Sequence, residues 1–200
     1  MTEIYDREDQ LRKQLNSVLE SEFQLPYADY YSRLDLDGFL HLKSVLSDIN
    51  NIFTLKVAIA FAKWVSNHLE LDNVTQKNII SQILSTKPNA NGYDIEVSGS
   101  VNIIAEVKCN IPINGGKVYG SAQKNGIAKD IGALINGKSK SQINPATCLK
   151  FMVFLDLPEI RTATEHFVKN MKEGKELITY ARNDILCRDK NRVYISYVRF

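Results

Sequence analysis

The chain has 200 residues, of which 44% are apolar and 24% are charged, an ordinary globular balance that argues against disorder. Its net charge of +2 alone says nothing about binding to nucleic acid. Three scattered cysteines and a charged N-terminus argue against a disulfide scaffold and a signal peptide. The longest apolar run, residues 57–65, contains Lys63 and is too short to span a bilayer. We therefore expect a cytoplasmic protein without a membrane-spanning segment.

The first half of the chain is predicted to be helical. Apolar residues recur at helical spacing over residues 5–24, and Pro26 with the tyrosines after it ends that segment. The same periodicity predicts three further helices, over residues 36–49, 53–71 and 74–86. Asp72 and Asn73 stand where the last of these helices needs an N-cap. A turn at residues 88–92 then closes the helical part.

The apolar period changes from 3.6 to 2 after this turn. Two strands are predicted over residues 93–97 and 101–108, joined by Ser98-Gly99-Ser100 as a hairpin. The elements expected next are a helix at 121–135, a buried strand at 149–157, a helix at 159–171 and a strand at 192–200. This order predicts an α/β fold with a mixed central sheet flanked by helices. We treat residues 1–200 as a single domain, with a helical N-terminal part at 1–72 and an α/β core at 73–200.

Basic residues gather after the middle of the chain. Between Lys108 and Gln142 there are six lysines and one acidic residue, Asp130, a net charge of +5. Such a region suits contact with a phosphate backbone, although a solvated lysine face has the same composition. The candidate phosphate contacts are Lys117, Lys124, Lys138 and Lys140.

The predicted hairpin carries the most informative polar residues. Because side chains alternate along a strand, Asp94 and Glu96 share one face of the first strand. Glu106 and Lys108 share one face of the second strand. A tight hairpin brings the two polar faces together, so two or three carboxylates and one ammonium converge at the end of a buried sheet.

Phosphodiester hydrolysis requires a group of this kind. Hard Mg²⁺ prefers carboxylate and carbonyl oxygens, and it activates a bound water. Asp94 and Glu106, with the backbone carbonyl of Val107, are the candidate ligands, and Lys108 is the candidate water-positioning residue. Glu96 is either an outer ligand or an exposed strand residue, and we favour the second.

The strand contexts of Asp94 and of Glu106-Val107-Lys108 resemble the PD-(D/E)XK nuclease superfamily, which includes many type II restriction endonucleases. The resemblance covers residues 74–157 and extends to the helix and strand that follow the motif. It implies a restriction-endonuclease-like core, Mg²⁺-dependent cleavage of double-stranded DNA and a homodimer. It also implies that Asp94 and Glu106 bind the metal and that Lys108 is the catalytic lysine.

The chain departs from the family pattern at several positions. Tyr93 stands where the motif has proline. Many relatives place another carboxylate on the helix before the sheet, a place for which Glu70 is the candidate. They also often carry glutamine or lysine on the helix after the motif, where Gln123 and Lys124 stand.

Three other functions remain open from the sequence. The same site chemistry serves repair, junction-resolving and RNA-cutting nucleases. A DNA-binding module on a nuclease-like fold without catalysis is the second alternative. A structural interaction protein, with the tyrosines at residues 27–31 as its partner surface, is the third. The intact Asp94, Glu106 and Lys108 set favours catalysis.

Overall fold

A computed structural model describes residues 6–86, 92–113, 116–139, 141–182 and 187–200. The chain divides into two compact units, one ending at Ile49 and one running from Asn50 to Phe200. Of the predicted turn at residues 88–92, only Gly92 lies within the described residues.

The first unit begins with helix α1, Arg7–Phe23, which confirms the helix predicted there. The Asp6 side chain caps it by accepting N–H groups of its first turn. The chain then turns at Pro26 and forms a 3₁₀ turn, η1, Tyr31–Arg33. The Asn16 side chain accepts the N–H of Tyr31 at 3.0 Å, so this segment folds back onto α1.

Helix α2 runs without a break over Leu36–His68, so the predicted division into helices at 36–49 and 53–71 was wrong. Residues 39–68 contain neither proline nor glycine, and Asn50-Asn51 lowers helix propensity by only a fraction of a kcal/mol per residue. Helix α2 is long and apolar enough to cross a membrane by length and composition alone. Core helices of soluble proteins meet the same two criteria. Its last turns carry the side chains that the second unit buries, among them Val57, Phe61 and Val65.

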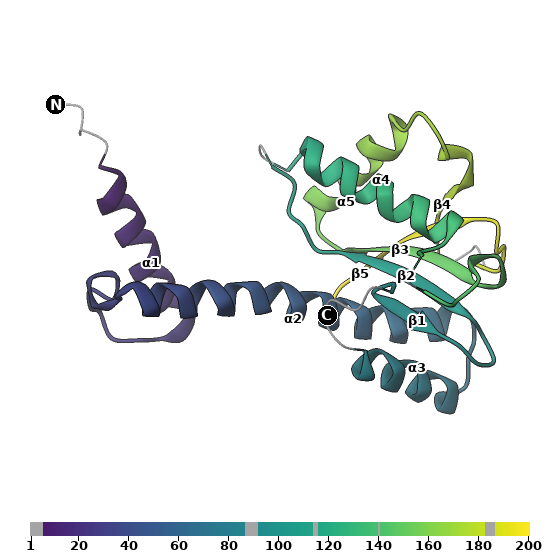
Figure 1. Ribbon diagram of the computed structural model, residues 1–200, viewed down its shortest axis with the longest axis horizontal. Coiled ribbons are helices and arrows are strands. Elements are labelled where there is room, and N and C mark those ends of the chain that lie inside the picture. The colour runs from purple at the N-terminus through teal and green to yellow at the C-terminus, as the bar shows by residue number, and fades with distance from the viewer. Residues whose placement is uncertain (1–5, 87–91, 114–115, 140, 183–186) are drawn as a thin grey trace. The chain divides into compact units, whose positions relative to one another are not determined.

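The second unit is built on a five-stranded mixed sheet of order β1-β2-β3-β5-β4 (Figure 1). The strands are β1 Ile95–Val97, β2 Ile103–Lys108, β3 Leu149–Leu155, β4 Ile178–Tyr180 and β5 Val193–Val198. Strands β1 and β2 are antiparallel, and the other neighbours are parallel. This confirms the predicted mixed sheet. Strand β4 was not predicted, because three half-buried residues at an edge carry no recognisable alternation.

Helices cover both faces of this sheet. They are α3 Asn73–Ser85, α4 Ser121–Asn136 and α5 Pro158–Lys169, with 3₁₀ turns η2 Pro145–Thr147 and η3 Lys175–Leu177. The part of α2 after Asn50 lies with α3 on one face, and α4 lies with α5 on the other (Figure 1). Strand β3 is therefore buried at every position, as its apolar run predicted.

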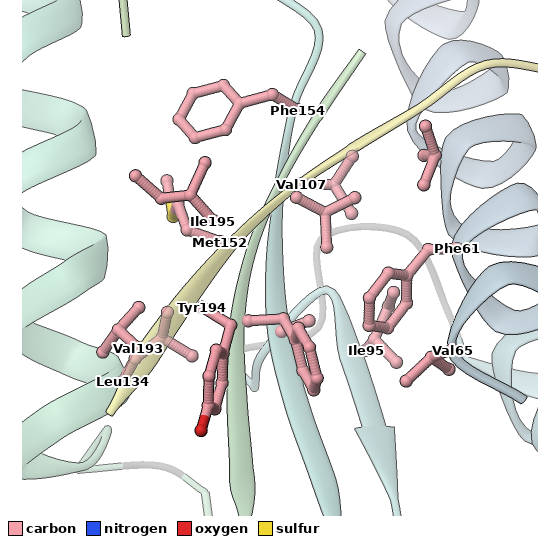
Figure 2. Close-up of a cluster of buried hydrophobic side chains, with 14 of the residues drawn as sticks. Phe61, Val65, Ile95, Val107, Leu134, Met152, Phe154, Val193, Tyr194 and Ile195 are labelled. Atoms are coloured by element: carbon pink, nitrogen blue, oxygen red, sulfur yellow. The ribbon is translucent and has the colours of Figure 1, made fainter. Parts of the chain in front are cut away.

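The core fills both layers between helices and sheet. Figure 2 shows Phe61 and Val65 of α2 on one side of the strands and Leu134 of α4 on the other. Phe61 packs edge-on against Phe151 of β3, with 5.0 Å between ring centroids. Because both faces are covered, a charged side chain within a central strand is buried. Glu106 is buried in this way, whereas Lys108, the last residue of β2, is half-buried.

Candidate functional site

The β1–β2 hairpin brings Asp94 and Glu106 together. Its register pairs Ile95 with Ala105, and one further step along the two antiparallel strands sets Asp94 opposite Glu106. Asp94 is exposed, and its Oδ2 accepts the N–H of Val107 at 2.8 Å. This bond replaces the ladder bond that β1 no longer provides there, and it holds the Asp94 carboxylate against the end of β2.

Glu106 is a buried carboxylate, only 4% exposed. Burial, and then the neighbouring charge of Asp94, raise its pKa to about 7 against the opposing effect of Lys138. Its Oε1 lies 2.5 Å from the Lys138 ammonium, an ion-pair distance. Oε1 is buried and makes no hydrogen bond among the described residues beyond this ion pair. The site therefore contains a buried oxygen suited to a cation.

Lys138 reaches this carboxylate from the end of α4. Gly137 ends the helix with a φ of 96°, a conformation that favours glycine, and its N–H bonds to the carbonyl of Ala133 at 2.8 Å. The Lys138 ammonium also donates to the Gly92 carbonyl at 2.7 Å. It lies 5.0 Å from the centre of the Tyr93 ring. The predicted phosphate contact is thus, in this structure, a neighbour of Glu106.

Lys108 has a partner from the middle of α4. Its ammonium lies 2.5 Å from Oδ2 of Asp130, and the two side chains are 24% and 17% exposed. Beside Lys108 is a hollow of about 290 Å³, which Gln123 and Gly126 also line. Helix α4 therefore supplies the carboxylate that pairs with Lys108, and the loop after α4 supplies the ammonium that pairs with Glu106.

The remaining predicted residues lie around this group or apart from it. Glu96 is half-buried, and its Oε1 accepts the N–H of Tyr93 at 2.9 Å. Glu70 is exposed in a left-handed turn after α2 (φ 56°), and no hydrogen bond or ion pair joins it to the hairpin within the described residues. Gln123 Oε1 accepts the N–H of Gly120, while its amide donates to the carbonyl of Ile111.

The candidate phosphate contacts differ in exposure. Lys117 is exposed and Lys124 is half-buried. Lys140 lies outside the described residues. Lys117 precedes α4 by four residues, and Lys124 lies in its first turn.

Two features of this group were missed from the sequence. Asp130 was counted only as the single acidic residue among six lysines, and that isolation was the one signal it gave. Lys138 was grouped with the other lysines because nothing in its neighbourhood separates it from them. Both partners are distant in sequence from β2, so only the packing of α4 on the sheet brings them there.

The oxygen donors available to a metal are few but suitable. Among the described residues there is no group of three or more histidine, cysteine or acidic side chains close enough to hold a metal ion. Mg²⁺, however, is often held by one or two carboxylates, with water and substrate phosphate completing its shell. Asp94 and Glu106 could supply those carboxylates. Three carboxylates, Asp94, Glu106 and Asp130, against the ammonium groups of Lys108 and Lys138 leave a formal charge of −1, which favours a further cation.

Comparison of the chain with protein-family models, with curated proteins and with solved structures found no match.

Proposed function

We propose that this protein is a Mg²⁺-dependent nuclease with a core like that of the PD-(D/E)XK superfamily. The observation that carries the proposal is the pairing of exposed Asp94 with buried Glu106 across the hairpin, with Lys108 two residues further along β2. The mixed sheet between helices supports the restriction-endonuclease-like core but does not by itself distinguish it from other α/β folds.

Each residue has a separate task in this proposal. Asp94 and Glu106, together with the carbonyl of Val107, hold the metal, which supplies Lewis-acid polarisation of the phosphoryl oxygen and a water of lowered pKa. Lys108 orients the attacking water and offsets the negative charge that grows on the phosphorus oxygens. Asp130 holds the Lys108 ammonium in place through the ion pair between them.

The substrate that we propose is double-stranded DNA, cut internally by a homodimer in the manner of type II restriction endonucleases. Support for a polyanionic substrate comes from Lys117 and Lys124, which lie just before and within the first turn of α4, the helix that also lines the hollow beside Lys108. A repair, junction-resolving or RNA-cutting nuclease would use the same residues, and the choice of substrate separates these classes.

One observation favours a DNA-binding module without catalysis as the second candidate. Lys108 and Glu106 each have an ion-pair partner, Asp130 and Lys138. A catalytically inactive site could keep these ion pairs simply to neutralise charges between the sheet and α4. Such a protein would bind DNA and would not cut it.

The test is cleavage of closed circular plasmid, of branched duplex and of RNA, in MgCl₂ and in EDTA. The wild type is compared with Glu106→Gln and Lys108→Met, and with Lys172→Met as a control in an exposed lysine outside the site. Mg²⁺-dependent cutting that is lost in the two site variants and kept in the control supports the nuclease. Binding of plasmid without cutting, in wild type and variants alike, supports the binding module instead.

A further inference from the structure

The Lys138 ammonium lies in surroundings that would suit a metal ion. It has the Glu106 Oε1 at 2.5 Å and the Gly92 carbonyl oxygen at 2.7 Å, and the face of the Tyr93 ring is 5.0 Å away. Two oxygens and an aromatic face make a cation site. The chain thus fills part of the proposed metal site with a cation of its own.

Lys138 is also held in a way that allows it to leave. It lies in the loop after α4, its side chain is 24% exposed, and four rotatable bonds separate its ammonium from the backbone. Glu106, by contrast, is fixed within β2 and is 4% exposed. The cation can therefore move out to solvent, whereas the carboxylate cannot follow it.

We propose that Lys138 is a built-in counter-cation that neutralises Glu106 in the metal-free protein and that a divalent metal ion displaces. This inference rests on the proposed metal site, but it does not depend on cleavage. The role of Lys138 follows from the charge of Glu106, because without a nearby cation Glu106 would be an unpaired buried carboxylate. Two cations on the same carboxylate oxygen would repel each other strongly at such short distances.

The competition has a measurable consequence. Part of the free energy of metal binding must be used to release Lys138, so the wild type binds metal more weakly than a variant without the ammonium. In Lys138→Met we expect Mg²⁺ affinity to rise on the order of tenfold, the factor that corresponds to one lost ion pair of moderate strength. We also expect MgCl₂ to raise the melting temperature of this variant more than that of the wild type.

The experiment is calorimetric titration of the full-length protein with MgCl₂, together with melting in MgCl₂ and in EDTA. Lys138→Met and Lys138→Gln both remove the charge, and the glutamine can still donate to the Gly92 carbonyl if the methionine variant folds poorly. Lys138→Arg keeps a cation and should bind Mg²⁺ like the wild type, as should the control Lys172→Met. Glu106→Gln should abolish binding in every background.

Each outcome decides one of the two proposals. Tighter Mg²⁺ binding in both uncharged variants supports the counter-cation, even if no nucleic acid is ever cut; in that case the nuclease proposal fails alone. Equal or weaker Mg²⁺ binding in these variants overturns the counter-cation, even if the wild type proves to be a nuclease. Absence of Mg²⁺ binding from wild type and variants alike overturns it too.

Discussion

Asp130 on α4 and Lys108 at the end of β2 form an ion pair with 2.5 Å between the carboxylate oxygen and the ammonium, although 22 positions separate them in the chain. Both side chains are mostly buried, so solvent screens the pair less than it would at the surface. The consequence is a lysine whose orientation is set by another element of the fold. This pair provides the most direct test of whether Lys108 works in catalysis.

Asp130→Asn should slow cleavage by roughly tenfold, the lower end of the loss that follows removal of a partner which orients a functional group. Lys108→Met should slow it by about 10²–10³, the usual loss for removal of one donor that stabilises transition-state charge. The double variant should be no slower than Lys108→Met alone, because Asp130 acts through Lys108. Single-turnover rates at saturating substrate measure all three. Additive losses in the double variant would show that Asp130 acts independently of Lys108.

The stability of the metal-free protein should depend on pH through Glu106. Burial, and then the charge of Asp94, raise the pKa of Glu106 from its ordinary 4.5 to about 7. The folded state therefore binds this proton more tightly than the unfolded chain does. The stabilisation that comes from binding this proton is complete below about pH 4.5 and is lost as the pH rises through 7. The loss is at most about 3 kcal/mol.

Urea unfolding in EDTA across this pH range measures the effect, with Glu106→Gln as the reference because the amide does not titrate. The free energy of unfolding of the wild type should fall relative to the variant as the pH rises. A constant difference between the two proteins would contradict the raised pKa.

The close approach of Gly92 to Glu96 predicts a non-additive pair of substitutions. A Cβ at position 92 would lie 2.5 Å from Oε1 of Glu96, the oxygen that accepts the Tyr93 N–H. Gly92→Ala should displace that carboxylate and cost about 1 kcal/mol, the value of the lost hydrogen bond. Glu96→Ala loses the same bond, so the double variant should be little less stable than either single one. Chemical denaturation gives the four free energies, and a cost equal to the sum of the two would refute this account.

Two glycines within α4 offer a matched test of the hollow beside Lys108. A Cβ would meet nothing within 4 Å at Gly126 or at Gly132. Alanine at either position should therefore stabilise the helix, by about 0.5–1 kcal/mol. Only Gly126 lines the hollow, so only Gly126→Ala should weaken substrate binding, measured by anisotropy on labelled duplex. Equal binding by the two stabilised variants would show that substrate does not approach α4 at this point.

Much of the fold could be predicted from the residues because it depends on local patterns. The N-cap at Asp72, the end of α4 at Gly137 and the apolar run of β3 each specify an element within a few residues of themselves. The error in α2 has the same origin. Asparagine weakens a helix slightly, and burial of side chains such as Phe61 outweighs that small preference.

The candidate site likewise has features that local sequence patterns predict and features that depend on tertiary packing. By itself the sequence predicted that the polar faces carrying Asp94 and Glu106 lie together, because strand alternation within a hairpin is local geometry. The predicted three-residue turn was wrong, because pairing ends at Val97 and Ile103 and residues 98–102 connect the strands. Only the tertiary structure decided that Glu106 is buried and which charged side chains pair with Glu106 and Lys108. Asp130 and Lys138 reach that strand through the packing of α4 against the sheet. Packing between elements distant in sequence depends on the whole core, and no short pattern records it.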